Sequence, residues 1–328
     1  MLNETQKLNS HIGQGEIEQK ATRDGFGEAL LYVGDTDSRT VALTGDLKES
    51  TRVEAFANKY PDRFIECGVA EQNMMGVAAG LALTGKIPCV SSYATFSPGR
   101  NWDQLRVSVC YSKANVKVIG AHTGVSVGPD GATHQALEDI ALTRVLPNLT
   151  VVQPIDSIEA YKATVALHYM QGPSYLRLTR EKTPVITSEE TPFRLGKAEI
   201  LKEGKDVALI GAGPILYNGI MAAIELEKEN IHVLVINSHT IKPLDEKTIV
   251  WAAKLTKAAV TLEEHQVHGG LGSAVAECLA TQYPIPIEMV GMPDTFGQSG
   301  PPEKLIENYG MGVESIKKAI RKVLARKL

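Results

Sequence analysis

Short apolar runs alternate with longer amphipathic stretches along most of the 328-residue chain. The runs are rich in valine, isoleucine and leucine and predict strands, whereas the stretches between them predict helices. This alternation is typical of parallel α/β folds. The predicted strands lie at 41–43, 63–66, 88–91, 116–121, 150–152, 175–177, 207–210, 233–236, 259–262 and 287–289. The predicted helices lie at 52–59, 70–83, 101–112, 135–144, 157–170, 215–229, 245–255 and 270–281, with another beginning near Thr22.

One polar interruption divides this alternation into two units. Residues 179–197 are polar, contain two prolines and indicate a linker. The sequence therefore predicts two consecutive parallel-sheet α/β domains, preceded by a polar segment that is either a loose leader or an arm packed on a partner. The predicted divisions are a flexible leader at 1–20, a first domain at 21–183, a linker at 184–198 and a second domain at 199–328.

The composition excludes several broad classes of function. A formal net charge of −4 does not favour a protein whose main partner is nucleic acid. No apolar run reaches the roughly 18 residues of a membrane-spanning helix, and the N-terminus lacks the apolar core of a signal peptide. We therefore expect a cytoplasmic protein without a membrane partner. The four cysteines are scattered without metal-ligand spacing, so we expect no metal site on this chain.

The densest cluster of glycine and polar residues runs from His122 to Asp139. It lies between a predicted strand and a predicted helix, the place where open α/β sheets bind ligands. We expect His122, Asp130 and His134 to converge there, because two imidazoles and a carboxylate suit proton transfer or hydroxyl recognition. The alternative is a glycine-rich turn in which Thr133 or Asp130 caps the following helix.

Two other segments carry candidate chemistry. Glu71 begins an apolar helix, where a buried carboxylate could share a proton with a ring nitrogen, although acidic residues also favour helix N-termini. Tyr93 and Phe96 follow a predicted strand and could wall a slot for a flat ring, or simply belong to the core.

Three residues are candidates for holding an anion. They are Arg23, Ser50 and Arg180. The planar fork of arginine suits phosphate, but a surface ion pair explains each arginine equally well when it is considered alone.

Taken in order, these motifs resemble the C-terminal half of transketolase, from about Thr22 to the end of the chain. The matching segments are GVAEQNMMGVAAGLAL at 68–83, YATF at 93–96, DQLR at 103–106, GPDGATHQALEDIALTRVLPN at 128–148 and EEHQVHGGLG at 263–272. The resemblance implies a domain that binds the pyrimidine of thiamine diphosphate, followed by a transketolase C-terminal domain.

The resemblance also implies roles for individual residues. Glu71 matches the glutamate that bonds the N1′ atom of the aminopyrimidine and thereby makes the 4′-imino nitrogen basic enough to remove the C2 proton. The cofactor then acts as the electron sink. Tyr93 and Phe96 match the aromatic pocket for that ring, with Tyr93 in place of the usual phenylalanine, and Asp46 is assigned to the cofactor side. On the substrate side, Asp130 matches a residue that contacts the C2 hydroxyl, and His134 matches a catalytic residue near the donor carbonyl. The groups that hold the sugar phosphate in the family match Arg23, Ser50, His122 and Arg180.

One part of the family pattern is missing from this chain. Transketolases hold the diphosphate and its Mg²⁺ or Ca²⁺ with a GDG motif and a later asparagine. Here Gly45-Asp46 is followed by Leu47, and Asp130-Gly131 lacks the leading glycine. The resemblance is therefore to the separately encoded C-terminal subunit of a split transketolase, active only with an N-terminal subunit that carries the GDG…N motif and the metal. It implies ketol transfer between sugar phosphates in the pentose phosphate pathway, by a homodimer of this chain or a heterotetramer.

Three alternatives stay open. 1-Deoxyxylulose-5-phosphate synthase has a similar glutamate helix and loop, although residues 135–139 fit transketolase better. The β subunit of a 2-oxoacid dehydrogenase component has nearly the same length but lacks the DGATHQ pattern. A non-catalytic structural or regulatory subunit of the same fold is the third, and the intact Glu71, Asp130 and His134 argue against it.

Overall fold

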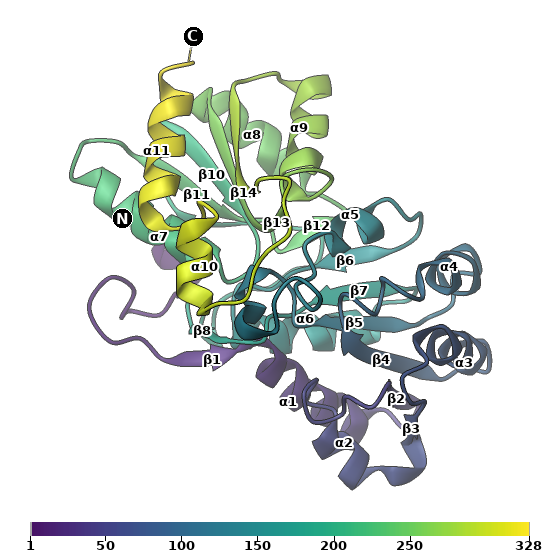
Figure 1. Ribbon diagram of the computed structural model, residues 1–328. Coiled ribbons are helices and arrows are strands. Elements are labelled where there is room, and N and C mark those ends of the chain that lie inside the picture. Colours follow the sequence, from purple (N-terminus) through teal and green to yellow (C-terminus); the bar gives the residue numbers. More distant parts are fainter. Residues whose placement is uncertain (1, 328) are drawn as a thin grey trace.

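Two α/β units follow one another along the chain and pack together (Figure 1). The structure is a computed structural model that describes residues 2–327; residues 1 and 328, the outer ends of the predicted leader and second domain, lie outside the described part. Each unit has its own central sheet, and parallel pairing dominates in both. The predicted fold class is therefore confirmed.

A seven-stranded sheet forms the centre of the first unit. Its own strands are β2 (Thr40–Thr44), β3 (Phe64–Glu66), β4 (Ile87–Tyr93), β5 (Lys117–Ala121), β6 (Thr150–Val152) and β7 (Ser174–Arg177). They are parallel, in the order β6-β7-β5-β4-β2-β3. Strands β2 and β5 are buried throughout, because helices cover both faces of the sheet.

The two faces of this sheet are covered by different helices. Phe26 and Leu30 of the first helix pack on one face, and Met74 and Met75 of the glutamate helix pack on the other. The helices are α1 (Thr22–Thr36), α2 (Glu54–Lys59), α3 (Glu71–Leu83), α4 (Trp102–Gln104), α5 (Asp139–Arg144) and α6 (Ser157–Tyr169), and a π-helical segment (Leu105–Tyr111) continues α4.

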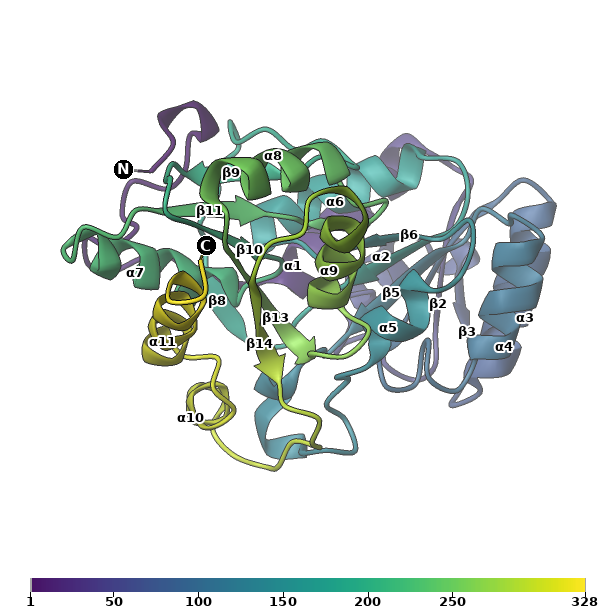
Figure 2. The same ribbon diagram turned by 90° about the horizontal axis from the view of Figure 1, so that it is seen from above.

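The second unit is built on a five-stranded sheet in the order β14-β13-β10-β11-β9. Its strands are β9 (Glu199–Lys202), β10 (Val207–Gly211), β11 (Val233–Asn237), β13 (Ala259–Gln266) and β14 (Ile287–Met292), of which only β9 is antiparallel to its neighbour. Helices α8 (Glu246–Thr256) and α9 (Leu271–Gln282) cover one face, and α7 (Leu216–Glu227) and α11 (Val313–Leu324) cover the other (Figure 2).

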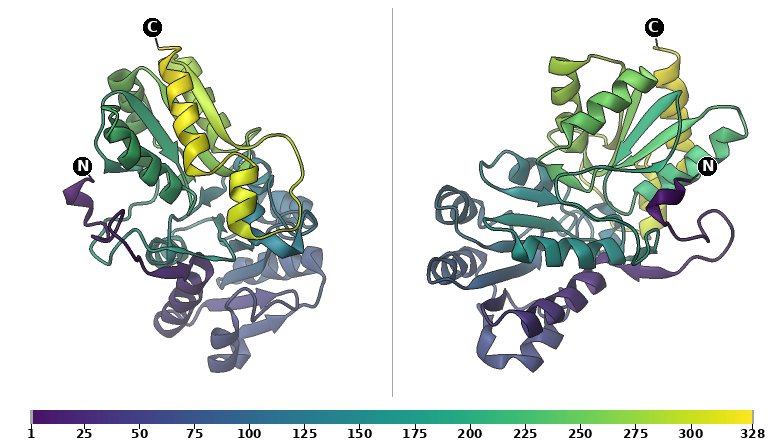
Figure 3. Two further views of the ribbon diagram at one scale, coloured as in Figure 1. Left: turned by 60° about the vertical axis from the view of Figure 1, so that its left-hand side comes forward. Right: turned by 180° about the vertical axis from the view of Figure 1, so that it is seen from behind.

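The two units exchange segments. Strand β12 (Thr240–Lys242) comes from the second unit but pairs antiparallel with β6, at the edge of the first sheet. In the other direction, the polar N-terminal segment runs beside the second unit before it enters the first (Figure 3). There the backbone nitrogen of Asn3 donates to the Leu201 oxygen at 2.9 Å, and Ile12 is buried among residues of the second core.

Several predicted boundaries are wrong. The polar stretch at 179–197 contains β8 (Lys182–Pro184), which pairs with β1 (Gln19–Ala21), so the first unit's strands extend to the start of the predicted linker. The helix predicted at 135–144 begins only at Asp139, because residues 131–138 belong to the glycine-rich turn. Helix α10 (Pro302–Asn308) and helix α11 were not predicted, although Ile316, Ile320 and Val323 of α11 follow a helical period. None of the helices within residues 2–327 is long and apolar enough to span a membrane.

Candidate active site

The predicted site residues gather at the carboxyl ends of the strands of the first sheet. Ser50 follows β2, Tyr93 ends β4, His122 follows β5 and Arg180 lies shortly after β7. Because parallel strands end at a common edge, this is the expected place for a ligand site. Glu71 reaches the same region from the first turn of α3.

Glu71 is a buried carboxylate with one cationic partner. Its side chain is 3% exposed, and Nη1 of Arg100 lies 3.1 and 3.3 Å from its two carboxylate oxygens. Asn101 donates from Nδ2 to the main-chain oxygen of Glu71 at 3.2 Å, which fastens the Arg100 segment to α3. The position at a helix N-terminus also favours the negative charge.

Four rings form a continuous aromatic wall next to Glu71. Tyr93 stacks on His122 with ring centroids 3.9 Å apart, and on Phe96 with centroids 5.9 Å apart. His134 meets Tyr93 and Phe96 edge-on, at 6.0 and 5.4 Å. Arg100 joins this wall to Glu71, because its guanidinium carbon lies 4.1 Å from the centroid of the Phe96 ring.

Several arginines, with acidic partners among them, lie at the other end of the wall. Arg23 donates from Nη1 to the Ser50 main-chain oxygen at 2.8 Å and lies 3.4 Å from Nε2 of His122. Burial, together with the charges of Arg23 and Arg180, lowers the pKa of His122 to about 3, so its imidazole is neutral at pH 7. Burial and the neighbouring charge of Arg52 also lower the pKa of Arg23. Several guanidinium groups close together are suited to an anionic ligand.

The side chain of Arg180, which follows β7, reaches the glycine-rich turn that carries Asp130. Arg180 donates from Nη1 to the Val127 oxygen at 2.9 Å and lies 3.8 Å from Oδ2 of Asp130. Gly128, with a positive φ of 80°, turns the chain between Val127 and Asp130. The structure therefore brings His122 and His134 onto Tyr93, whereas Asp130 faces Arg180 instead of contacting either histidine.

Asp46 is set apart from the other predicted residues. It follows β2 with a φ of 61°, and its backbone nitrogen donates to Oε1 of Glu66 at 2.8 Å. Its side chain is exposed, and its carboxylate makes no hydrogen bond or ion pair within residues 2–327.

Two residues of this site were missed by the sequence analysis, Arg100 and Arg52. Arg100 lies in a turn between two predicted elements, and its side chain meets Glu71 of α3 only in the folded chain. Arg52 pairs with Asp24 at 2.6 Å and adds its charge to the corner around Arg23. No spacing rule marks either residue.

The wall and the carboxylate can hold a flat group that bears an N–H. The guanidinium of Arg100 demonstrates the fit, because it lies over the Phe96 ring and hydrogen-bonds Glu71 at the same time. A nitrogen heterocycle with an adjacent donor has the same shape and hydrogen-bonding needs. Within residues 2–327, no group of three or more His, Cys, Asp or Glu residues is arranged to hold a metal ion.

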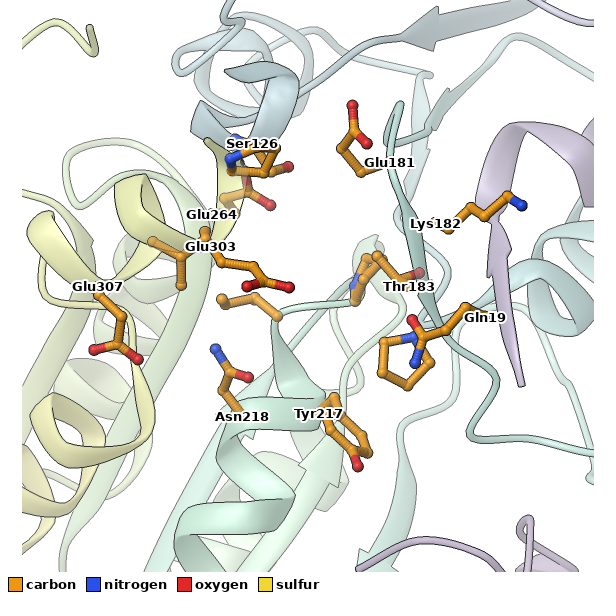
Figure 4. Close-up of a pocket in the computed structure, with 15 residues that line it drawn as sticks. Gln19, Ser126, Glu181, Lys182, Thr183, Tyr217, Asn218, Glu264, Glu303 and Glu307 are labelled. Atoms are coloured by element: carbon orange, nitrogen blue, oxygen red, sulfur yellow. Dashed lines mark hydrogen bonds between the residues drawn. The ribbon is translucent and has the colours of Figure 1, made fainter. Parts of the chain in front are cut away.

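A separate cavity of about 750 Å³ lies between the two units (Figure 4). Glu264 and Glu303 point into it from one side, and Glu181 lies across from them. Oε1 of Glu264 accepts a hydrogen bond from the Ser126 nitrogen at 2.6 Å. None of the residues that line this cavity is a predicted site residue, so the aromatic wall and the cavity are distinct features.

Comparisons with known proteins show which family the two units belong to. Residues 18–185 match the family described as "Transketolase, pyrimidine binding domain", and residues 196–316 match "Transketolase, C-terminal domain". The chain is 40% identical over 312 residues to the 6-deoxy-6-sulfo-D-fructose transketolase subunit SqwH of Clostridium sp., covering 95% of this chain and 97% of that one. It is also 40% identical over 304 residues to a putative transketolase C-terminal section of Methanocaldococcus jannaschii, covering 92% and 95%.

Longer relatives and solved structures extend the comparison. Human transketolase is 36% identical over 310 residues, which cover 93% of this chain but only 49% of that protein. A solved structure described as "Split gene transketolase, inactive beta4 tetramer" superimposes with a TM-score of 0.88 at 44% identity, over 94% of this chain and 99% of that one. Transketolase from Campylobacter jejuni shares the fold, with a TM-score of 0.80 at 23% identity, over 94% of this chain and 47% of that one.

Proposed function

The chain belongs to the transketolase family, and from that membership we propose that it is the C-terminal subunit of a two-subunit, thiamine-diphosphate-dependent transketolase. Its reaction is the reversible transfer of a two-carbon ketol unit from a ketose phosphate to an aldose phosphate. A partner subunit with the GDG…N motif supplies the diphosphate and Mg²⁺ or Ca²⁺ site. The observation that carries the proposal is the buried Glu71 carboxylate, which shares one flat group with the Phe96 ring.

In this proposal the cofactor is held from two directions. Tyr93 and Phe96 hold the face of the aminopyrimidine and exclude water, and Glu71 holds a proton at its N1′ atom. A buried carboxylate suits that task because little water competes for the proton. Asp46, at the end of β2, stays assigned to the cofactor side. When bound, the cofactor supplies the electron sink that the two-carbon fragment requires.

The substrate is assigned to the residues beyond the wall. Nδ1 of His134 is engaged by the Thr133 hydroxyl at 2.8 Å, so Nε2 is the atom that we assign to the donor's C1 hydroxyl and carbonyl. Asp130 offers carboxylate oxygens to the C2 hydroxyl. We assign the anionic end of the sugar to the corner where Arg23 contacts Ser50 and His122, and where the charge of Arg180 acts on His122.

Arg180→Ala and Ser50→Ala are expected to weaken phosphorylated substrates far more than unphosphorylated ones. Charge-assisted hydrogen bonds to phosphate are worth about 1.5–3 kcal/mol, so kcat/KM should fall about 10–100-fold. The comparison is between a ketose phosphate and hydroxypyruvate in the reconstituted enzyme. Equal losses for both donors would remove these residues from the anion site.

The same corner would accept a sulfonate, because the relative SqwH is named for a 6-sulfo sugar. A matched series of phosphorylated, sulfonated and neutral donors would separate the two anions. Preference for the phosphate would support a role in the pentose phosphate pathway, which, with a cytoplasmic location, is part of this proposal.

Assembly through α3 is a further part of the proposal. Exposed apolar side chains lie along α3 and the π-helical segment: Val69 just before α3, Leu83 at its end, and Val107 and Tyr111 on the π-helical segment, with Tyr111 83% exposed. Gly76 and Gly80 lie on the same helix with open space around them. An exposed apolar surface of this kind favours association, here with a second copy or the partner subunit, as a homodimer or heterotetramer.

Mixing this chain with its partner tests the proposal. With thiamine diphosphate and Mg²⁺, neither chain alone should transfer ketol units, the mixture should do so, and sedimentation should show a complex larger than either chain. Transfer by this chain alone would contradict the two-subunit assignment. Complex formation without transfer would instead support a structural or regulatory subunit.

A further inference from the structure

The side chain of Arg100 bridges Glu71 and Phe96. Its Nη1 lies 3.1 and 3.3 Å from the two carboxylate oxygens of Glu71, and its Cζ lies 4.1 Å from the centroid of the Phe96 ring. A flat cation therefore stacks on the aromatic face and donates to the buried carboxylate. These are the two contacts that the proposed function assigns to the aminopyrimidine ring. The ring and the Arg100 side chain therefore cannot occupy this place at the same time.

The backbone of Arg100 is fixed, whereas its side chain can leave. Its nitrogen donates to the Phe96 oxygen at 2.9 Å, and the next residue, Asn101, is tied to the main chain of Glu71. The turn requires Gly99, because a Cβ there would lie 2.0 Å from a backbone oxygen. The Arg100 side chain is 50% exposed, so an alternative rotamer reaches solvent.

We propose that Arg100 is a positioning residue that occupies the seat of the aminopyrimidine while no cofactor is bound and moves to solvent when the ring enters. The inference rests on the proposed function. An unpaired carboxylate at 3% exposure would be costly, and Arg100 removes that cost. Because the arginine is half-exposed, water solvates its charge once it leaves, and the incoming ring gives the Glu71 carboxylate a new partner, so the ring can displace it. Its planar, delocalised cation matches a slot shaped for a flat ring.

The inference predicts the sign of a change in affinity. If Arg100 competes with the ring, Arg100→Gln should bind the ring more tightly. If Arg100 only supports Glu71, the same variant should bind it more weakly or equally well. Arg100→Lys keeps the charge without the flat group and should fall between the wild type and Arg100→Gln.

Two titrations test this prediction. In the first, the isolated full chain is titrated with 4-amino-5-hydroxymethyl-2-methylpyrimidine by NMR. In the second, the reconstituted pair is titrated with thiamine diphosphate and Mg²⁺ by calorimetry. In both, Arg100→Gln should lower Kd about three- to tenfold. Arg194→Gln removes an exposed arginine from another buried carboxylate, that of Glu199, so it is the matched control and should leave Kd unchanged.

The outcomes separate the inference from the function on which it rests. Ligand binding that is equal or weaker in Arg100→Gln overturns the role of Arg100 and leaves the proposed function standing. Failure of the wild-type pair to bind thiamine diphosphate overturns both. If Arg100→Gln does not fold, as judged by circular dichroism, Arg100→Lys decides in its place: tighter binding than the wild type supports the inference, and equal or weaker binding overturns it.

Discussion

Glu71→Ala is expected to lower ketol transfer by the reconstituted enzyme at least about 100-fold, because general acid–base contributions are typically 10²–10⁴-fold. The weakly acidic C2 proton of thiamine diphosphate must be removed at neutral pH. The 4′-imino nitrogen is basic enough only when N1′ carries or shares a proton, and Glu71 is the buried carboxylate assigned to that atom. Alanine cannot replace it, whereas Glu71→Gln keeps one weak hydrogen bond and should give an intermediate rate.

Hydrogen–deuterium exchange at C2, followed by NMR, measures this step directly. If Glu71 only stabilised the start of α3, its loss would cost about 0.3–1 kcal/mol of stability and leave exchange unchanged. Glu54→Ala is the matched control, since Glu54 is an exposed acid in the first turn of α2. An exchange rate in Glu71→Ala within a few-fold of the wild type would reject the catalytic role.

Asp139→Leu is expected to destabilise the chain by about 3–5 kcal/mol, the usual cost of leaving one charge of a buried ion pair without its partner. Asp139 accepts hydrogen bonds from the Tyr175 hydroxyl at 2.7 Å and from Nε and Nη2 of Arg177 at 2.8 and 3.1 Å. Burial opposes the charge of Arg177, but the attraction of Asp139 outweighs it and holds the pKa of Arg177 above its ordinary value. Nη2 of Arg177 also donates to the main-chain oxygen of Glu264 at 2.9 Å, so the network connects the two units.

Thermal unfolding measures the effect. For domains of this size the loss corresponds to a fall in Tm of roughly 6–20 °C. The double variant Asp139→Leu/Arg177→Met removes both charges and should recover most of the loss. Glu277→Gln, which breaks an exposed pair with Arg144, is the control and should cost less than about 1 kcal/mol. A similarly small effect for Asp139→Leu would contradict the network's stabilising role.

Periodicity was sufficient wherever an element was long or fully buried. Strands β2, β5, β10 and β11 are mostly apolar and buried throughout, and α3 and α6 begin within a residue of their predicted starts. Such elements can be recognised from their own residues, because a strand that is buried on both faces must be apolar at nearly every position. The candidate site followed from the same logic, since the ends of parallel strands must share an edge.

The features that the sequence analysis missed depend on contacts between distant segments. Lys182–Pro184 and Thr240–Lys242 are short and partly polar, and each becomes a strand only because a partner lies beside it. Arg100 is similar, since neither its neighbours nor its spacing indicates that it pairs with Glu71. Helix α11 is a different case: its period was readable in the sequence and was overlooked.

The exchange of segments makes each unit depend on the other for part of its packing. Recombination that replaced the second unit with that of a homologue would also replace the strand that closes the edge of β6, and an open edge is prone to pair with other chains. The incoming unit would in addition need a surface that accepts the segment around Asn3 and Ile12. The two units therefore cannot be exchanged independently of each other, even though the junction between them has the sequence of an ordinary linker.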